Sequence, residues 1–392
     1  MLEVFRMEAG AFAAADGRPR GSKASRIACD VICCPKDPRY GESIRKFQGC
    51  PTIAVTRNGR IYLGWYSGGV REPDMDNYNL LIYSDDGRSW SDPILVIPSN
   101  REKYIHALDI QLWISPDNRL YVYWVQNSVK PAPDKMPVYP ASQPAVISDG
   151  FLFDDFEHAE WMICCENPDA DNIQFSKPKY LYKGFLRCKP LVLQNGSWLH
   201  FNYNQLDTRY GCSVSRDRGQ SFTYYYGSKK ILTQFDEAMA YERMDGSVRM
   251  LARSSVGELA ESISYNGGKT WSEAKLSGIA NPGTRFFVSR TPSGRILLIN
   301  NDCRTNRTNM TVYLSEDDGA TWKYKRLIDN RNWVSYPDAD FYNGKIYMVY
   351  DRDRLGAKEI LFLSFSEENV MDGAYQFCPL VISRPEFIKI EG

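Results

Sequence analysis

Six segments of the chain repeat one pattern, in which an apolar strand, a tight polar turn and a second apolar strand follow one another. The segments are PTIAVTRNGRIYLGWYS, IQLWISPDNRLYVYWVQ, PLVLQNGSWLHFNYNQ, AMAYERMDGSVRMLARS, FFVSRTPSGRILLINND and DADFYNGKIYMVYDRD. Their turns lie at Gly59, Asn118, Gly196, Gly246, Gly294 and Gly344, so successive turns are 59, 78, 50, 48 and 50 residues apart. Similar sheet units at a nearly constant spacing are typical of a propeller, in which each unit buries its faces against its neighbours. The pattern predicts an all-β fold, a six-bladed β-propeller with four strands in each blade and little helix.

A shorter motif, S-x-D-x-G-x-T-W, occurs four times. The copies are Ser315–Trp322, Ser264–Trp271 with asparagine for aspartate, Ser215–Phe222, and Tyr83–Trp90 with tyrosine at its first position. In such a hairpin the aspartate can bond nearby backbone amides, the glycine supplies a positive φ, and the aromatic ring packs beneath the turn. We interpret the four copies as structural turns, which support the fold strongly and a function only weakly.

The repeats predict a single propeller domain over residues 1–392. The long spacing of 78 residues marks an insertion at 129–146, whose prolines favour an exposed loop. Residues 1–40 precede the first repeat, and within them Ser25–Cys33 has the composition of a strand. We expect this N-terminal segment to close the ring by pairing with the last blade.

Composition excludes several classes of function. The 48 lysines and arginines balance the 48 acidic residues, so no net field favours nucleic acid or a membrane surface as a partner. The ten cysteines include two adjacent pairs but no C-x-x-C spacing typical of zinc, so we expect reduced thiols and no metal or other cofactor. The N-terminus lacks the apolar core of a secretory signal, which favours a cytoplasmic protein.

The funnel of a propeller lies where the first strand of each blade begins and its second strand ends. Ligand sites are concave, so we expect binding and catalytic residues at these positions. Blade four begins after Glu237, and its second strand ends at Arg253. Blade five begins at Arg285, and Arg307 follows its second strand. Blade six opens with Tyr336, in the stretch SYPDAD.

Further candidates occupy the same positions of the first three blades. Asp109 opens blade two, and Lys189 opens blade three. Arg45 precedes blade one, while Glu72 and Asp74 lie in the loop that follows its second strand. The sequence therefore predicts that carboxylates and cations from several blades meet in one cavity.

With the four motifs and the six blades, these residues resemble the sialidase (neuraminidase) superfamily, in its bacterial BNR-repeat branch, over nearly the whole chain. In that family a glutamate followed by an arginine across one blade, an arginine just upstream of a box, and a tyrosine that opens the last blade form the site. Glu237 with Arg253, Arg307 and Tyr336 match this order. The resemblance implies a propeller of sialidase type and an exo-acting glycoside hydrolase that releases a terminal sialic acid, or a related acidic sugar, from a glycan.

The implied roles have physical reasons. Sialic acid carries a carboxylate on its anomeric carbon, which repels an anionic nucleophile, whereas a neutral tyrosine deprotonated by a glutamate avoids this repulsion. Tyr336 and Glu237 would fill these roles, and the arginines would bind the carboxylate by charge-assisted hydrogen bonds. A general acid must protonate the leaving oxygen, and its candidates are Glu72, Asp74 and, in reserve, Asp109.

The first blade departs from the family pattern. Sialidases carry an arginine before Ile-Pro there, whereas this chain has Gly-Cys-Pro at 49–51. One charged hydrogen-bond partner is worth about 1.5–3 kcal/mol, so its loss lowers affinity roughly tenfold to a hundredfold or more unless another residue replaces it. Arg45, Arg285 and Arg71 are candidates, although Arg285 and Lys189 also suit contacts between blades.

Two other functions fit the same residues. One is a carbohydrate-binding propeller without turnover. The other is a polysaccharide lyase, in which a tyrosine acts as base and an arginine neutralises a uronate. The products discriminate among the three functions, because a hydrolase releases a reducing sugar, a lyase releases an unsaturated sugar, and a binding module releases neither.

Overall fold

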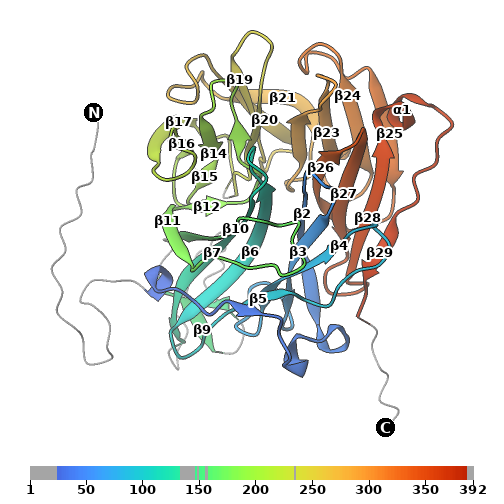
Figure 1. The fold of residues 1–392 in the computed structure, drawn as a ribbon. Helices are drawn as coiled ribbons and strands as arrows, with labels where there is room; N and C mark the ends of the chain where they lie inside the picture. Colours follow the sequence, from blue (N-terminus) through green and yellow to red (C-terminus); the bar gives the residue numbers. More distant parts are fainter. Residues whose placement is uncertain (1–23, 133–145, 148–149, 155–157, 234, 386–392) are drawn as a thin grey trace.

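The computed structural model describes residues 24–132, 146–147, 150–154, 158–233 and 235–385. These residues form seven sheets, six of which are arranged as blades around a central axis (Figure 1), which confirms the predicted six-bladed propeller. Helix in these ranges is limited to α1 (Glu367–Met371) and three short 3-10 helices. Within the described ranges, the chain has no helix with the length and apolarity that crossing a membrane requires.

The first three blades follow one another along the chain, and each contains a set of four antiparallel strands, to which the sheets of blades one and two add further strands. Blade one contains β2 (Phe47–Val55), β3 (Ile61–Gly68), β4 (Tyr78–Ser84) and β5 (Leu95–Pro98). Blade two contains β6 (Ile105–Ile114), β7 (Leu120–Pro131), β10 (Ala159–Cys165) and β11 (Lys179–Lys183). Blade three contains β13 (Leu191–Val192), β14 (Trp198–His200), β16 (Arg209–Ser215) and β17 (Thr223–Lys229), with β12 (Phe185–Leu186) and β15 (Asn202–Tyr203) as a separate pair.

The last three blades are regular four-stranded antiparallel sheets. Blade four contains β18 (Met239–Glu242), β19 (Val248–Ala252), β20 (Glu258–Ser264) and β21 (Lys275–Ala280). Blade five contains β22 (Phe287–Arg290), β23 (Ile296–Asn301), β24 (Met310–Ser315) and β25 (Tyr324–Asp329). Blade six contains β26 (Val334–Tyr342), β27 (Lys345–Arg352), β28 (Glu359–Ser366) and β29 (Leu380–Ser383).

The hydrophobic core lies in layers between neighbouring blades. The innermost strand β2 is buried along its whole length, because the adjacent blades cover both of its faces. One apolar cluster joins Leu63 and Leu80 of blade one to Val349 and Phe362 of blade six. Each blade therefore depends on its neighbours for burial, which is why the apolar strands recur at a constant spacing.

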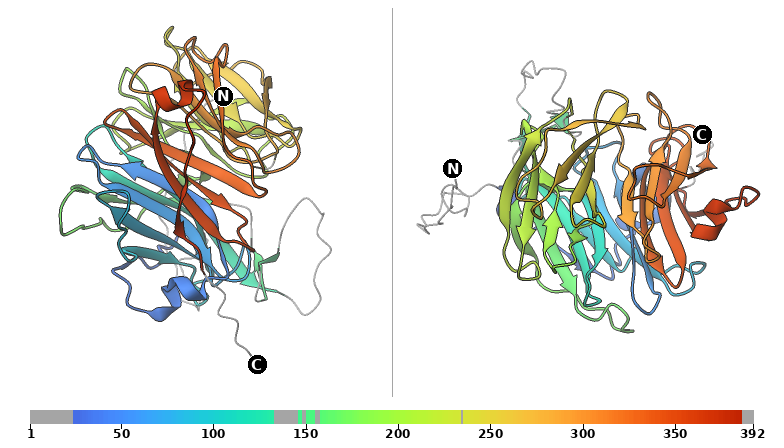
Figure 2. Two further views of the ribbon diagram at one scale, coloured as in Figure 1. Left: turned by 90° about the vertical axis from the view of Figure 1, so that its right-hand side faces the viewer. Right: turned by 90° about the horizontal axis from the view of Figure 1, so that it is seen from above.

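The ring closes where the first blade packs against the last one. Figure 2 shows the blue and red sheets side by side, and β2 contacts both β26 and β27. Asp338 Oδ2 accepts hydrogen bonds from Thr52 Oγ1 at 2.6 Å and from the Ile53 amide at 3.0 Å. Packing and these buried bonds close the ring, since the two blades belong to separate sheets.

The expectation that Ser25–Cys33 pairs with the last blade is wrong. β1 (Ile32–Cys33) pairs instead with β5 and adds a fifth strand to blade one. The preceding backbone is held by blade two, because Trp161 Nε1 donates to the Ser25 carbonyl at 2.8 Å and the Cys29 amide donates to Gln126 Oε1 at 3.1 Å. Ala24 and Cys29 of this segment are buried in the apolar cluster that blades one and two share.

The predicted insertion at 129–146 begins as an extension of a strand. β7 continues to Pro131 and pairs there with β9 (Phe151–Phe153), which also pairs with β8 (Val146–Ile147). The first part of the insertion is therefore strand rather than loop. Residues 133–145 lie outside the described residues.

The Asp-box motifs form turns held by their own side chains. In blade five, Ser315 Oγ accepts from the Gly319 amide at 2.8 Å, and Asp317 Oδ1 accepts from the Thr321 amide at 2.8 Å. The boxes that begin at Ser215 and Ser264 repeat these bonds. The motif is therefore structural, as the sequence predicts.

The copy in blade one has a different register from the predicted one. Ser84 Oγ accepts from the Gly87 amide at 2.9 Å, and Asp86 Oδ1 accepts from the Ser89 amide at 2.8 Å. The motif thus begins at Ser84 rather than at the preceding tyrosine, and it is one residue shorter. Asp85, the aspartate that the sequence pattern selects, forms an ion pair with Arg60 instead.

Candidate active site in the funnel

A cavity of about 270 Å³ opens at the funnel, where the inner strands of the blades meet. Its polar lining includes Glu72, Asp109, Arg187, Glu237, Arg253, Arg307, Tyr336 and Arg354. Its apolar lining includes Pro73, Leu108, Phe153, Phe185 and Phe235. One pocket thus combines several ionisable groups with apolar side chains, as small-molecule sites usually do.

A larger cleft of about 820 Å³ shares the loop 69–77 with this cavity. Tyr40, Arg45, Asp74 and Tyr78 are among its lining residues. The cleft is wider and contains no pair of nucleophile and base among its described lining residues. We therefore place the candidate chemistry in the smaller cavity.

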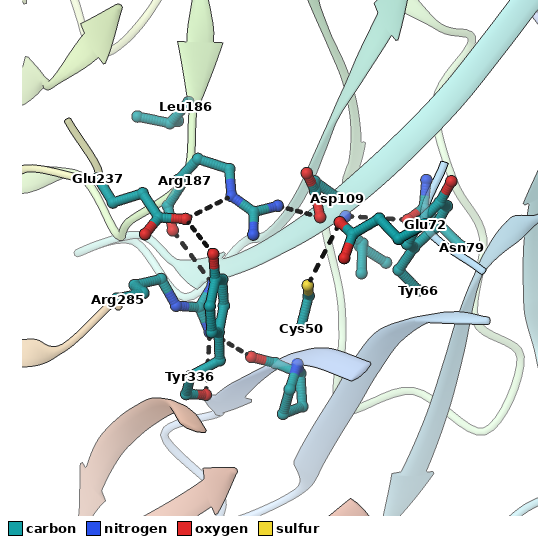
Figure 3. A network of polar contacts seen from close by, with 12 residues as sticks. Cys50, Tyr66, Glu72, Asn79, Asp109, Leu186, Arg187, Glu237, Arg285 and Tyr336 are labelled. Carbon is teal, nitrogen blue, oxygen red and sulfur yellow. Dashed lines mark hydrogen bonds and ion pairs between the residues drawn. The ribbon is translucent and has the colours of Figure 1, made fainter. Parts of the chain in front are cut away.

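The centre of the cavity is a hydrogen-bonded pair from blades four and six. Tyr336 Oη donates to Glu237 Oε1 at 2.7 Å, and in Figure 3 the two side chains point toward each other. Arg253 Nη1 lies 2.8 Å from Glu237 Oε2 and 3.2 Å from Tyr336 Oη. The phenol, the carboxylate and the guanidinium therefore form a closed triangle.

An unusual backbone conformation turns several side chains into the funnel. Positive φ angles occur at Cys50 (56°), Asp109 (56°), Glu237 (38°) and Tyr336 (55°). Three of these residues lie at irregularities in the pairing of the first two strands of their blades, namely β2 with β3, β6 with β7, and β26 with β27. Such a bulge adds one residue and redirects its side chain. For a residue other than glycine this conformation costs on the order of 1–3 kcal/mol and is concentrated at functional sites.

Arginine side chains surround the ring of Tyr336. The guanidinium carbons of Arg354, Arg285, Arg187 and Arg307 lie 4.2, 5.0, 5.4 and 5.4 Å from the ring centroid. Each cation is attracted to the electron-rich face of the ring. Together they place four cations beside Tyr336, which are groups suited to binding an anionic ligand.

The charges fix the protonation of the central pair. Burial raises the pKa of Glu237, but the charges of Arg253 and Arg187 and the hydrogen bonds from Tyr336 and Arg253 outweigh burial and hold this pKa at about 2. Burial and the charge of Glu237 raise the pKa of Tyr336, although Arg253 and Arg187 oppose them. At neutral pH the pair therefore consists of a neutral phenol that donates to an ionised carboxylate.

Arg187 connects the central pair to a second carboxylate. It forms an ion pair with Asp109, and its Nε lies 3.5 Å from Glu237 Oε1 (Figure 3). Arg187 and Asp109 are both 3% exposed. The ion pair therefore places two opposite charges together where both side chains are nearly inaccessible to solvent.

A second group of polar contacts lies on the side of blade one. Each of the residues Cys50, Glu72 and Asp109 has one atom of a type that can ligate a metal ion, and these three atoms lie within 4.8 Å of one another. Arg354 pairs with Glu72 and Arg187 pairs with Asp109, while burial raises the pKa of the Cys50 thiol to about 11. The arginine charges compensate the carboxylate charges, and the thiol is protonated. Charge pairing therefore explains this cluster, and we assign no metal to it.

The structure brings six of the predicted site residues to the cavity. These are Tyr336, Glu237, Glu72, Asp109, Arg253 and Arg307. Arg285 lies behind the ring, where it donates to the carbonyl oxygens of Arg187 at 3.2 Å and Tyr336 at 3.3 Å. Lys189 forms an ion pair with Asp338 at 2.9 Å, below the cavity lining. Both cations support the backbone between blades.

Arg45 and Asp74 lie outside the cavity. Arg45 donates to the hydroxyl of Tyr78 at 3.3 Å and to the carbonyl of Tyr40 at 3.1 Å, within the larger cleft. Asp74 accepts from the Asp76 amide at 2.8 Å and so fixes the loop that carries Glu72. Arg71, the other candidate for the missing arginine, is exposed.

Sequence reasoning missed two arginines of the site. Arg187 lies two residues before Lys189, at the start of blade three, and Arg354 follows the second strand of blade six. Both lie where the first strand of a blade begins or its second strand ends. Their position within the blade is therefore the sequence signal that identifies them. Their contacts with Asp109 and Glu72 had no sequence signal, because these partners come from other blades.

Comparison with known proteins agrees with the fold. Residues 59–348 match a family described as BNR repeat-like domain. Over 187 residues the chain is 29% identical to an anhydrosialidase from Macrobdella decora. This alignment covers 41% of the present chain and 24% of that protein, so the chain spans about a quarter of its length.

Solved structures include several sialidases with the same architecture. The NanB sialidase from Streptococcus pneumoniae superposes with a TM-score of 0.65 at 16% identity, covering 84% of this chain and 70% of that one. The intramolecular trans-sialidase from Ruminococcus gnavus gives a TM-score of 0.64 at 15% identity, covering 87% of this chain and 98% of that one. At these identities the likeness establishes a shared fold.

Proposed function

The chain belongs to the BNR repeat-like domain family, and we propose that it is an exo-acting glycoside hydrolase that releases a terminal sialic acid, or a related acidic sugar, from a glycan. The observation that carries this proposal is the hydrogen bond of 2.7 Å from Tyr336 Oη to Glu237 Oε1 inside a cavity lined by arginines. A neutral phenol beside an ionised carboxylate suits a substrate whose anomeric centre bears a negative charge, because it approaches that centre without repulsion.

In the first step the neutral phenol becomes the nucleophile. Glu237 Oε1 accepts the proton of Tyr336 while Tyr336 Oη attacks the anomeric carbon. The bond from the anomeric carbon to the leaving oxygen breaks, and a bond to Tyr336 Oη forms. The neighbouring guanidinium groups stabilise the negative charge that develops on the phenol oxygen, since they are already in place before the reaction.

The leaving oxygen needs a proton, and Glu72 is the best placed of the predicted acids. Its side chain is 28% exposed and lines the cavity, so it can exchange protons with solvent. Asp109 is ion-paired with Arg187, and Asp74 accepts backbone bonds of its own loop. Glu72 protonates the leaving group in the first step and takes a proton from water in the second, as microscopic reversibility requires.

In the second step water attacks the anomeric carbon and releases Tyr336. The phenol oxygen then recovers its proton from Glu237, so the enzyme returns to its starting state. The cavity of about 270 Å³ lies below the roughly 300–1,000 Å³ usual for drug-sized ligands. It therefore suits one terminal sugar rather than an internal stretch of a glycan, and this supports exo action.

The substrate class is tested with a panel of aryl glycosides of N-acetylneuraminic acid, a 3-deoxy-2-keto acid, a uronic acid and a neutral hexose. We expect release of the aryl alcohol from one of the acidic 2-keto sugars. Tyr336→Phe, at equal concentration, is the control for contaminating glycosidase activity. Mass analysis of the freed sugar distinguishes hydrolysis from intramolecular transfer, in which the product lacks one water.

Three results would contradict the proposal. An unsaturated product that absorbs in the ultraviolet would identify a lyase. Binding of a glycan without release of the aryl alcohol would identify a carbohydrate-binding propeller. Cleavage of the neutral hexoside faster than the acidic sugars would remove the reason for a tyrosine nucleophile among arginines.

A further inference from the structure

Arg354 reaches from blade six to the place where the sequence lacks an arginine. It follows β27, and its side chain lies across Gly49 at the funnel end of β2. A Cβ atom at position 49 would lie 2.6 Å from Arg354 Cδ and 2.7 Å from its Cγ and Nε. Such contacts are too short for any side chain, so glycine at 49 provides the space that Arg354 fills.

The guanidinium of Arg354 is held in place, but not all of its N–H groups have a hydrogen-bond acceptor. Its Nε donates to Asp351 Oδ2 at 2.9 Å, and its Nη1 donates to Glu72 Oε2 at 2.9 Å. Its Nη2 is buried and has no hydrogen-bond acceptor among the described residues. Since the Arg354 side chain is 15% exposed and lines the cavity beside Tyr336, an anionic ligand there would lie next to a fixed cation that keeps one N–H group without an acceptor.

The two carboxylates that contact Arg354 differ in how firmly they are fixed. Asp351 is fully buried and also accepts from the Cys50 amide at 2.8 Å and from Ser335 Oγ at 2.6 Å. Glu72 is partly exposed and lies on the loop between β3 and β4. Asp351 therefore positions the arginine permanently, whereas Glu72 can leave it.

We propose that Arg354 is the anchor for the substrate carboxylate, supplied by blade six in place of a first-blade arginine, and that Glu72 is its resting counter-ion, which the substrate carboxylate displaces. This inference deepens the proposed function and rests on it for the acidic sugar. It assigns a specificity-determining role to Arg354 and a supporting one to Gly49, which leaves room for its side chain.

The displacement also explains how a glutamate beside an arginine can act as an acid. In the resting site Glu72 Oε2 lies 2.9 Å from Arg354 Nη1 and is paired with its charge. When a substrate carboxylate takes over Arg354, Glu72 loses its cation and has a second negative charge nearby, and both changes favour its protonated form. Upon substrate binding, Glu72 would thus take up a proton from solvent and would later donate this proton to the leaving oxygen.

The anchor is tested by binding, independently of turnover. The probes are the methyl glycoside of N-acetylneuraminic acid, or of the acidic sugar cleaved fastest in the panel, and its matched carboxamide. Calorimetry gives the ratio of their dissociation constants for the wild type, Arg354→Ala, Gly49→Ala and the double variant. Arg304→Ala is the matched control, because Arg304 pairs with Glu258 and is 55% exposed.

We expect the wild type to prefer the acid, and Arg354→Ala to lose about tenfold to a hundredfold of this preference, the value of one charged hydrogen-bond partner. Gly49→Ala should lose a similar factor, because its methyl group displaces the Arg354 side chain. The double variant should bind the acid no more weakly than Arg354→Ala, whereas independent structural damage would add. Arg304→Ala should keep the wild-type ratio.

The counter-ion role has its own readout. Glu72→Gln should bind the acid several-fold more tightly than the wild type, because no carboxylate competes for Arg354, and yet turn over glycosides more slowly. Calorimetry in two buffers of different ionisation enthalpy should show proton uptake when the wild type binds the acid, and none for Glu72→Gln. Equal or weaker binding by Glu72→Gln would overturn this part of the proposal.

The results separate the anchor from the hydrolase. If no glycoside is cleaved but the acid preference depends on Arg354, the hydrolase proposal fails and the anchor stands. If glycosides are cleaved but Arg354→Ala keeps the acid preference, the anchor fails and the hydrolase stands. A wild type that does not prefer the acid over its carboxamide overturns the anchor.

Discussion

The two ends of the blades differ in how their polar groups find partners. At the end that carries the Asp-box turns, Ser315 accepts from Gly319 and Asp317 accepts from Thr321, in each case four residues away. At the funnel end, Tyr336 contacts Glu237 across 99 positions of the chain. The first end is built from neighbours in sequence, and the second from neighbours in space.

The two ends also differ in what their conformation costs. Asp317 is exposed and accepts hydrogen bonds from Ser315 and Thr321 of its own turn, so this turn needs little support from other blades. Glu237 is 1% exposed, has a positive φ and depends on two arginines for its charge. Strain and buried charge of this kind persist only where the surrounding structure enforces them. The comparison indicates that the box end is stabilised by contacts within one turn, whereas the conformation of the funnel end depends on contacts between blades.

The largest effect is expected at the funnel. Tyr336→Phe removes one hydroxyl, and turnover of the best glycoside should fall on the order of 10⁴-fold because the nucleophile is lost. Thermal melting should change little. Tyr241→Phe is the matched control, since its hydroxyl donates to the Asp318 carbonyl at the box end, and it should keep full turnover. Near wild-type turnover by Tyr336→Phe would show that the hydroxyl at the funnel end is no more important for turnover than the hydroxyl at the box end.

A combined variant sharpens the same point. Glu237→Gln alone should reduce turnover about as much as Tyr336→Phe, because the phenol then has no base. The double variant should be little worse than either single one, since groups that act as a unit are not additive. Rate losses that multiply across the two variants would show independent roles.

At the box end the effect should appear in stability instead. Ser315 is buried, and Ser315→Ala leaves the Gly319 amide without its acceptor. We expect the free energy of unfolding to fall by about 1–3 kcal/mol, as for other unsatisfied buried groups, with turnover unchanged. Denaturant titration and steady-state kinetics on one preparation check both parts. A loss of activity larger than the loss of folded protein would contradict the separation of the two ends.

The charge of Glu237 should make the funnel sensitive to acid. Its pKa is lowered from 4.5 to about 2 in the fold, so its contribution to stability is present above pH 4.5 and is lost as the pH falls toward 2. The difference in free energy of unfolding between wild type and Glu237→Gln should narrow by about 2 kcal/mol from about pH 5 to about pH 3. Urea titrations at both pH values measure it, and a constant difference would show that this pKa is not lowered.

The smallest effect tests the register of the box in blade one. Asp86→Ala removes an acceptor of the Ser89 amide, and we expect the thermal midpoint to fall by about 1–3 °C. Asp85→Ala breaks only a pair with Arg60 in which the aspartate is 62% exposed, and such pairs contribute little. A larger fall for Asp85→Ala would favour the register taken from the sequence pattern.

Much of the fold could be predicted from local signals. The strand–turn–strand repeats indicated the blades correctly. The BNR-repeat family of the predicted resemblance is confirmed by the family match, and its propeller fold by the solved structures. The pairing of Ser25–Cys33 was wrong because its partners, Trp161 and Gln126, are 136 and 97 positions away along the chain. The box register was wrong by one residue because Ser84 and Tyr83 both stand before a plausible turn.

The candidate site was only partly accessible from sequence. Tyr336, Glu237, Arg253 and Arg307 followed from blade position and family order, and they line one cavity in the structure. Arg354 was missed because nothing near it in the chain relates it to the glycine at position 49, which its side chain covers. When another blade supplies an arginine in place of the expected one, the motif of the first blade contains no sign of this replacement.

The sequence by itself determined the number of blades, the position of their turns and the residues offered to the funnel. These properties follow from hydrophobic periodicity and turn chemistry, which act over a few residues. Only the tertiary structure decided which offered residues meet, that Glu237 is ionised and Tyr336 neutral, and that Arg354 lies over Gly49. Coulomb interactions and desolvation depend on distances through space between blades, and these distances exist only once the ring has closed.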